Sequence, residues 1–291
     1  MIIVCLKGGL GNQMFQYALA RNLAERHNTP LKMDASAYDY EGPLEYYLGR
    51  FNVREEFASP REVAELTGIK QSRLGEWVHS LLHRHRKIPR TFVRWNKSAF
   101  NPAILKTPDD SYVEGYFCSE RYFSDIESII RREFSFRDGP SGGNADIASM
   151  IGSCESVSVH VRRGDYISDP KTNQTHGTCD ADYYHRCVEY VRAKTAEPRF
   201  FVFSDEPQWC RENLGLPAPA TFVDCNGPQN PCEDLRLMSL CRHNIIANST
   251  FSWWAAWLNA NKSKIVLAPR KWFAAKIYNI DDILPAGWVR M

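Results

Sequence analysis

Strands and helices are expected to alternate strictly through the second half of this 291-residue chain, and this pattern constrains the fold more than any other feature. Short runs of β-branched and aromatic residues are separated by segments in which apolar residues recur at helical spacing. The expected strands are 156–161, 199–204, 221–225, 244–248 and 264–268, and the expected helices are 181–194, 207–214, 232–243 and 251–261. Such alternation implies a parallel sheet with right-handed crossovers, whose ligands bind beyond the carboxyl ends of the strands.

The first half is also α/β, although it is less regular. Residues 2–6 predict a buried strand, the glycines that follow predict a turn, and residues 13–27 have the apolar spacing of a helix. A second strand is expected at 31–35. A strand, a glycine turn and a helix in this order make half of a Rossmann unit.

Local signals place one further helix and the domain boundary. Ser59 has the character of an N-cap, with Pro60 at the first helical position and Glu62 at the third. The stretch 137–145 contains three glycines and a proline, which is typical of a linker. We therefore expect an N-terminal α/β domain at residues 1–140 and a C-terminal Rossmann-like domain at residues 141–291.

Composition and charge exclude several classes of protein. The formal net charge is only +2, so the chain has no global attraction to nucleic acid. Its nine cysteines include no C-x-x-C pair, and neither cysteines nor histidines have zinc-ligand spacing, which favours a reduced, cytoplasmic chain. No run approaches ~20 apolar residues, so no segment is expected to span a bilayer. The basic stretch 79–90 favours a solvated face, and contact with the inner face of a membrane or a lipid-linked acceptor is the alternative.

The segment HVRRGDY places four ionisable groups at the expected end of a strand. If the strand continues, its alternation points His160 and Arg162 to one face and Arg163 to the other. The planar fork of an arginine suits a bidentate grip on phosphate. Gly164 permits a sharp turn, and Asp165 can hold an arginine in place. An Arg–Asp ion pair that merely closes the strand is the alternative, and the position at a strand end favours the phosphate site.

The segment NSTFSWWAAWL leads from a strand into a helix whose first turn carries Ser249, Thr250 and Ser252. The free N–H groups and the positive dipole end of a helix can bind an anion. Ordinary N-capping by a hydroxyl is the alternative, and a second phosphate-suited segment at a neighbouring strand end favours the anion site. Three tryptophans at helical spacing are expected in the core rather than against a sugar: Trp253, Trp254 and Trp257.

Three further motifs are weaker. The glycine turn lacks the spacing of a G-x-G-x-x-G fingerprint, but it permits close approach of a ligand, with amide contacts from Asn12 and Gln13. In FSDE, Ser204, Asp205 and Glu206 offer acceptors for a guanine edge, although an aspartate here can equally cap a helix. In CDAD, two acids precede a helix, which favours a helix N-terminus over a divalent metal site: Asp180 and Asp182.

GGLGNQMFQYA, HVRRGDY and NSTFSWWAAWL, in this order, resemble the α-1,2-fucosyltransferases of glycosyltransferase family eleven in its bacterial form. The resemblance extends from Ile2 to about Pro269. It implies a GT-B fold, in which two Rossmann-like domains face each other across a cleft. It also implies inverting, metal-independent transfer of L-fucose from GDP-β-L-fucose to O2 of a terminal galactose, in surface polysaccharide or glycan synthesis. The N-terminal domain would then take the acceptor side, and the C-terminal domain would bind GDP-fucose.

The resemblance also implies roles for single residues. Arg162 grips the donor diphosphate with support from Arg163 and His160, and Asp165 orients the loop. The catalytic candidates are therefore Arg162, Asp165 and His160. By the same resemblance, the β-phosphate and fucose are held by Ser249, Thr250 and Phe251, the donor and acceptor side of the cleft is lined by Gly9, Gly11 and Asn12, and two family tyrosines are matched by Tyr183 and Tyr184. The FSDE motif adds Ser204 and Asp205 to the donor-binding candidates.

Some questions stay open in the sequence. Residues 36–50 and 75–100 match no family pattern, so the acceptor glycan is not identified. No general base is assigned: Asp165 and His160 are nearest to the motif, and a water relay is an alternative. Another nucleotide-sugar enzyme would keep the phosphate groups and use a different donor, whereas a carbohydrate-binding module would lack a diphosphate site. A Rossmann dehydrogenase is disfavoured by the incomplete glycine fingerprint.

Overall fold

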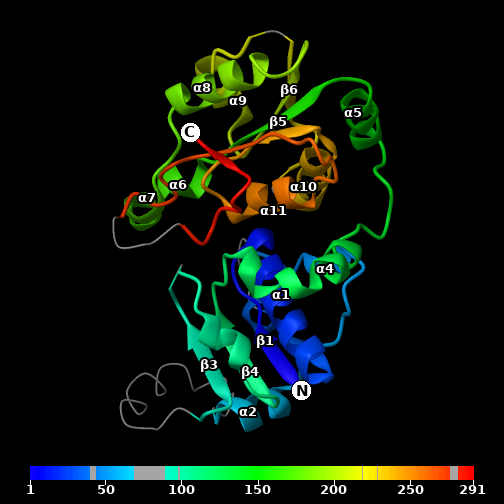
Figure 1. Cartoon of the computed structure of the whole chain (residues 1–291), viewed down its shortest axis with the longest axis vertical. Helices are drawn as coiled ribbons and strands as arrows, with labels where there is room; N and C mark the ends of the chain where they lie inside the picture. The colour runs from blue at the N-terminus through cyan, green and yellow to red at the C-terminus, as the bar shows by residue number, and fades with distance from the viewer. Residues whose placement is uncertain (40–43, 69–88, 98, 218, 228, 276–280) are drawn as a thin grey trace. The chain divides into compact units, whose positions relative to one another are not determined.

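The computed structural model describes residues 1–39, 44–68, 89–97, 99–217, 219–227, 229–275 and 281–291. The chain divides into two compact units, Met1–Ser135 and Phe136–Met291 (Figure 1). The division falls a few residues before the expected boundary after residue 140. Helix α5, Gly143–Gly152, begins inside the glycine-rich stretch, and Gly142 before it takes a positive φ of 54° that favours glycine.

The second unit contains a six-stranded, fully parallel sheet in the order β10-β9-β8-β5-β6-β7. Its strands are β5 (Ser156–Val161), β6 (Arg199–Ser204), β7 (Ala220–Val223), β8 (His243–Ile245), β9 (Val266–Ala268) and β10 (Val289–Arg290). This is the classical dinucleotide-binding order, which reverses direction between the first and fourth strands, here β5 and β8. The strands expected from the alternation pattern are all present, and β10 is an addition.

Helices connect these strands and cover both faces of the sheet. Figure 1 shows α8 and α9 on one side and α10 and α11 on the other. The helices that follow α5 are α6 (Gly164–Ser168), α7 (Pro170–His176), α8 (Ala181–Arg192), α9 (Pro207–Asn213), α10 (Pro231–Leu240) and α11 (Thr250–Leu258). The expected helices correspond to α8 through α11, whereas α6 and α7 were not anticipated from the sequence.

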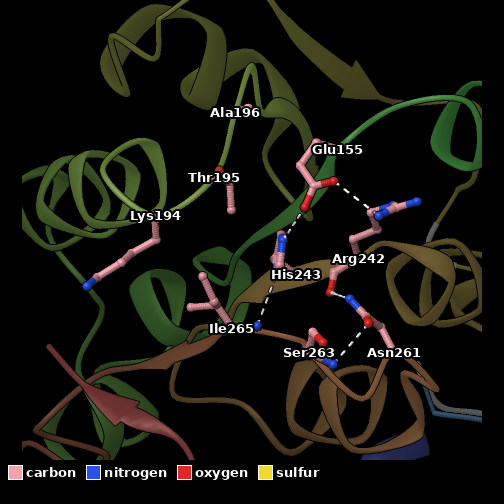
Figure 2. A pocket seen from close by; sticks show the side chains of 9 residues that line it. All are labelled: Glu155, Lys194, Thr195, Ala196, Arg242, His243, Asn261, Ser263 and Ile265. Carbon is pink, nitrogen blue, oxygen red and sulfur yellow. Dashed lines mark hydrogen bonds and ion pairs between the residues drawn. The ribbon is translucent and has the colours of Figure 1, made fainter.

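At the amino edge of this sheet, polar side chains bond to one another and to the backbone. A cavity of about 460 Å³ lies there, and its lining residues include Glu155, Lys194 and Arg242. Figure 2 shows the side chains of these residues. The Glu155 carboxylate accepts a hydrogen bond from His243 Nε2 at 2.7 Å and pairs with Arg242 at 3.2 Å. Because His243 Nδ1 accepts from the backbone N–H of Ile265 at 2.9 Å, both ring nitrogens are occupied.

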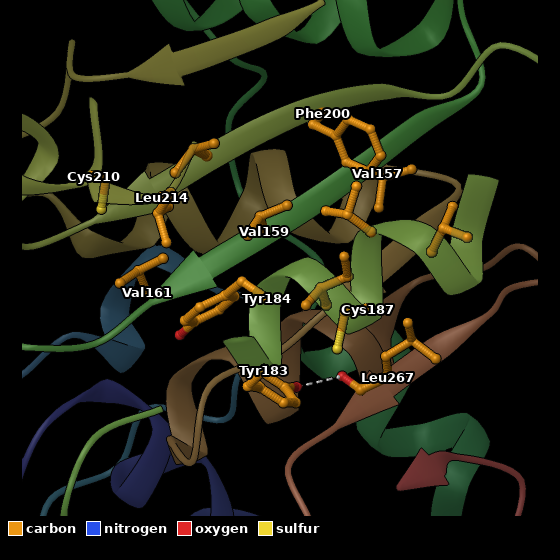
Figure 3. Packing of buried hydrophobic residues seen from close by; sticks show 14 residues of the cluster. Val157, Val159, Val161, Tyr183, Tyr184, Cys187, Phe200, Cys210, Leu214 and Leu267 are labelled. Carbon is orange, nitrogen blue, oxygen red and sulfur yellow. Dashed lines mark hydrogen bonds between the residues drawn. The ribbon is translucent and has the colours of Figure 1, made fainter. Parts of the chain in front are cut away.

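The core of the second unit lies between β5 and α8. Val157, Val159 and Val161 are fully buried on this face of β5. Figure 3 shows Tyr183 and Tyr184 of α8 packed against this layer. The three tryptophans of α11 are also buried, as expected: Trp253, Trp254 and Trp257.

The first unit is built on a four-stranded parallel sheet in the order β2-β1-β4-β3. Its elements are β1 (Ile2–Cys5), α1 (Leu10–His27), β2 (Leu31–Asp34), η1 (Ser36–Tyr38), η2 (Leu48–Arg50), α2 (Pro60–Thr67), β3 (Phe92–Trp95), η4 (Pro102–Lys106), β4 (Ser111–Gly115), η5 (Glu120–Tyr122), η6 (Ser124–Ile126) and α4 (Glu127–Glu133). The predicted capping box of α2 is confirmed, because the Ser59 and Glu62 side chains each bond to the other residue's backbone N–H.

Helix α1 carries a buried polar cluster that ties it to α4. The Tyr17 hydroxyl donates to Glu133 Oε2 at 2.7 Å and accepts from the backbone N–H of Arg54 at 2.9 Å. Arg21 donates to the same carboxylate at 3.1 Å. Burial and the negative charge of Glu133 raise the pKa of Tyr17, so this hydroxyl stays a donor.

Candidate functional site

Three of the motifs meet at the carboxyl edge of the second sheet. Parallel pairing of β5 with β6 aligns Val161 with Ser204, so the residues that follow, Arg162 and Asp205, leave the sheet side by side. The turn after β8 lies on the other flank of β5, because β8 pairs with β5. The order of the strands reverses between β5 and β8, which is where ligands of such sheets bind.

The guanidinium of Arg162 is bound by two carboxylates, those of Asp165 and Asp205. Its Nη2 donates to Asp165 Oδ1 at 2.5 Å, and its Nη1 pairs with Asp205 Oδ2 at 2.9 Å. These two contacts engage both terminal nitrogens of the guanidinium, which has five N–H donors in all. Strand β5 ends at Val161, so the strand alternation does not govern the direction of this side chain. The Arg–Asp ion pair of the alternative interpretation is present, and the phosphate site stays a prediction.

Arg162, Asp165 and Asp205 form what we call the Arg162 cluster. Arg163 stabilises this cluster but its guanidinium is not part of it. Its backbone N–H donates to Asp205 Oδ1 at 2.9 Å, its Nε bonds Glu206 at 2.9 Å, and its guanidinium stacks 3.7 Å over the ring of Trp209. Gly164 is required beside it, because a Cβ there would lie 2.7 Å from Asp205 Oδ2. Both carboxylate oxygens of Asp205 therefore serve the arginines, and this side chain does not cap α9.

Burial raises the pKa of Asp205, and the positive charge of Arg162 opposes that shift. Ser204 lies behind this carboxylate, where its hydroxyl accepts from the backbone N–H of Glu206 at 2.9 Å. The side chains of Ser204 and Asp205 thus shape the cluster from the β6 side.

His160 lies beneath the cluster, inside the sheet. It is 5% exposed, its Nδ1 lies 2.8 Å from Ser252 Oγ, and its ring contacts that of Phe251. Burial, with a further contribution from Arg162, lowers the pKa of His160 to about 3. The histidine is therefore neutral at physiological pH and links β5 to α11.

The turn after β8 is both capped and polar. Ser249 is the N-cap of α11 and accepts from the backbone N–H of Phe251 at 3.3 Å. Thr250 and Phe251 are half-buried in the first turn. The capping interpretation is thus correct, and it coexists with the positive end of the α11 dipole at the same edge as Arg162.

Sequence comparison identifies the family. The model of "Glycosyl transferase family 11" matches residues 79–291. This chain belongs to glycosyltransferase family 11. Over its full length it is 31% identical to an alpha-1,2-colitosyltransferase of Escherichia coli, covering 99% of that protein. It is also 33% identical, over 99% of both chains, to the O-antigen biosynthesis glycosyltransferase WbnK of Escherichia coli. A galactoside alpha-(1,2)-fucosyltransferase 2 of Oryctolagus cuniculus is 29% identical over 86% of this chain and 65% of its own.

Solved structures agree on the fold. The fucosyltransferase NodZ from Bradyrhizobium aligns with a TM-score of 0.50 and 15% identity over 87% of this chain and 90% of its own. A mutant of Arabidopsis thaliana FUT1 in complex with GDP aligns with a TM-score of 0.50 and 11% identity over 91% of this chain and 69% of its own. The expected family and the GT-B fold class, with two Rossmann-like units, are confirmed, and the protein is a glycosyltransferase.

In this family 11 chain, the glycine turn lies at the carboxyl end of β1 in the first unit. Gly8 has a positive φ of 79°, and Gly9 and Gly11 begin α1. The expectation that Gln13 contacts a ligand is wrong, because this side chain is fully buried and donates to the carbonyls of Gly8 and Glu45. Its amide group stabilises the turn. The position of Gln13 in the motif does not show this.

Gly9, Gly11 and Asn12 all lie in the Met1–Ser135 unit, whereas Arg162, Asp205 and Thr250 lie in the other one. Each unit thus presents its own motifs at the carboxyl edge of its own sheet. The basic stretch 79–90 lies largely outside the described residues. Among those that are described, no helix is long and apolar enough to cross a membrane.

The remaining predicted positions are structural in the second unit. Asp180 caps α8 by accepting from the backbone N–H of Tyr183 at 2.8 Å, as the helix interpretation of CDAD predicts. The Tyr183 hydroxyl donates to the carbonyl of Ile246 at 2.7 Å, and that of Tyr184 donates to the carbonyl of His160 at 3.1 Å. These tyrosines brace the strands that carry the site.

Three residues at this edge were missed from the sequence. Buried Asn248 donates through Nδ2 to the carbonyls of His176 and Trp272, at 3.0 and 3.1 Å. Tyr166 stacks on His176 with ring centroids 4.8 Å apart. Asn248 and Tyr166 lie inside the quoted motifs and could have been noticed there, whereas His176 has no motif signal.

Proposed function

We propose that this protein is a galactoside α-1,2-fucosyltransferase. It transfers L-fucose from GDP-β-L-fucose to O2 of a terminal β-galactoside, with inversion, in the synthesis of a surface polysaccharide or other glycan. The observation that carries the proposal is the Arg162 cluster, in which an arginine is fixed by Asp165 and Asp205 where the strand order reverses. The name of the Oryctolagus cuniculus relative, a galactoside alpha-(1,2)-fucosyltransferase, supports this transfer, and the colitosyltransferase shares the α-1,2 linkage in its name.

The chemistry requires stabilisation of a departing nucleotide. Transfer passes through an oxocarbenium-like state while negative charge builds on GDP. Preorganised cations and N–H dipoles stabilise such charge best, because they need no reorganisation during the reaction. Arg162 and the first turn of α11 would supply both, and we propose that the reaction needs no metal ion.

Asp165 and His160 take positioning roles in this proposal. The Asp165 side chain is half-exposed and paired with Arg162, which suits orientation of the guanidinium. His160 is buried and neutral beneath the cluster, so it would support Arg162 without reaching the acceptor. The general base for the galactose hydroxyl stays unassigned.

The two units would divide the substrates between them. The second unit would bind GDP-fucose through Arg162, with Arg163 and Asp205 in support, and through Ser249, Thr250 and Phe251 at the start of α11. The first unit would take the acceptor side, through Gly9, Gly11 and Asn12 at the carboxyl end of β1. Action at the cytoplasmic side of a membrane, on a lipid-linked acceptor, fits this chemistry and belongs to the proposal.

A second donor deserves comparison, because a full-length relative is named for transfer of colitose. Colitose is L-fucose without the 3-hydroxyl. A site that hydrogen-bonds this hydroxyl would reject the deoxy sugar by about 10⁴-fold or more, whereas an apolar pocket discriminates only weakly. The ratio of kcat/KM for GDP-fucose and GDP-colitose therefore separates the two donors.

The test is transfer from GDP-fucose to lactose and N-acetyllactosamine in excess EDTA, with the product linkage read by NMR. Arg162→Ala should lower the rate by about 10²- to 10⁴-fold, as loss of other preorganised charge contacts does. Arg192→Ala is the matched control, because Arg192 pairs with Glu189 on the exposed surface of α8. A wild-type protein that does not bind GDP would refute the proposed donor site, and an inactive EDTA-treated enzyme rescued by metal would refute metal independence.

A further inference from the structure

His176, at the end of α7, lies at the edge of the site, although it belongs to no motif in the sequence. Its ring stacks nearly parallel on Tyr166, with an interplanar angle of 16°, and contacts Phe273 at 5.4 Å. The guanidinium of Arg162 lies 5.5 Å from the other ring of this stack, that of Tyr166. Tyr166 therefore contacts both His176 and Arg162, the proposed diphosphate contact.

The elements of the site itself fix the position of this histidine. Its backbone carbonyl accepts from Asn248 Nδ2 at 3.0 Å and from the backbone N–H of Ala274 at 3.2 Å. Asn248 belongs to the turn that begins α11, and Tyr166 belongs to the loop of Arg162. Movement of His176 would therefore disturb both halves of the proposed donor site.

The two ring nitrogens of His176 differ in which of them carries the proton. Among the described residues, the buried Nδ1 atom has no hydrogen-bond partner. A buried N–H without an acceptor is rarer in proteins than a buried acceptor without a donor, so Nδ1 is the bare nitrogen and Nε2 carries the proton. An imidazolium would place an unsatisfied N–H at Nδ1. Burial and the charge of Arg162 lower the pKa of His176, while Asp165 opposes them, so the ring is neutral.

We propose that His176 is a neutral hydrogen-bond donor of the donor site, whose Nε2–H binds an oxygen of the nucleotide diphosphate. The inference rests on the proposed function, because it needs a diphosphate beside Arg162. A neutral donor stabilises the charge that builds on the leaving group without repelling the adjacent guanidinium. The bond strengthens as the glycosidic bond breaks, so its contribution falls mainly on kcat.

Two substitutions separate donation from stacking. His176→Phe keeps an aromatic ring between Tyr166 and Phe273 and removes the donor. His176→Gln removes the ring and places an amide N–H near the position of Nε2. The measurements are steady-state kinetics with GDP-fucose and lactose, GDP affinity by calorimetry, and the thermal midpoint of each variant.

The proposal expects His176→Phe to keep the wild-type midpoint, to lose about 100-fold in kcat and to bind GDP about tenfold more weakly. His176→Gln should recover at least a tenth of wild-type kcat. The opposite ranking, an active Phe variant and an impaired Gln variant, would show that the ring only packs and would overturn the proposal. Equal losses in both variants would also overturn it. A wild-type protein that fails to bind GDP is a different outcome, because it rejects the proposed function itself.

Discussion

The buried histidine of β5 should make the stability of the protein depend on pH. His160 is 5% exposed, and burial lowers its pKa from 6.5 to about 3 in the folded chain. Between these two values the unfolded chain binds a proton that the folded chain does not. The free energy of unfolding therefore falls as the pH falls below 6.5, and the loss ends near pH 3.

The size of the effect follows from the shift. Each pH unit inside this window changes the free energy of unfolding by about 1.4 kcal/mol for one proton. At pH 5 the contribution of His160 is therefore a loss of about 2 kcal/mol relative to pH 8. The substitution His160→Asn removes the titration and keeps a polar atom near Nδ1 to bond Ser252 Oγ, which lies 2.8 Å from Nδ1.

The assay is urea unfolding of the wild type and His160→Asn at several values from pH 8 to pH 5. At pH 7 and above, the difference between the two proteins measures only the change in packing, so it serves as the internal control. By pH 5 this difference should move by about 2 kcal/mol in favour of the variant, while other titrating groups cancel. A difference that stays constant over the whole range would refute the neutral, buried state of His160.

Two further substitutions test the packing of each unit. Gly164→Ala should lower kcat/KM by roughly 100-fold, because its Cβ would lie 2.7 Å from Asp205 Oδ2 and displace that carboxylate from Arg162. The control is Gly152→Ala, where a Cβ meets open space. Equal values of kcat/KM for both variants would contradict the argument. Tyr17→Phe should cost about 1–3 kcal/mol in urea unfolding without changing KM for GDP-fucose, because it removes one donor from the buried Glu133 carboxylate and the acceptor of the Arg54 backbone N–H. A cost below about 0.5 kcal/mol would show that Arg21 alone satisfies the carboxylate.

Much of the second unit could be read from the sequence, because its strands and helices alternate regularly. All six residues of β5 are buried, and its three valines, which alternate with two serines and a histidine, mark it as a strand. The first unit was harder to read. Strand β3, Phe92–Trp95, is only partly covered, and β4 is interrupted by polar residues, so neither shows a clear period.

The motif residues were visible for a different reason: glycines, paired arginines and hydroxyls at strand ends have few structural uses. Their partners were not visible. Asp205 meets Arg162 only because β6 pairs with β5 in one register. In the chain, Asp205 comes 42 residues after Arg163. His160 appeared to be a base candidate next to the arginines, and its burial under α11 is a property of the packed sheet.

The sequence by itself determined the parallel α/β class, the strand ends that carry chemistry and the family to which the chain belongs, because local periodicity and residue type are enough for each. Only the tertiary structure decided which charges face each other, that Gln13 and His160 are interior groups, and that His176 stands beside Arg162. Those properties depend on strand order, register and burial, which arise from contacts between segments far apart in the chain.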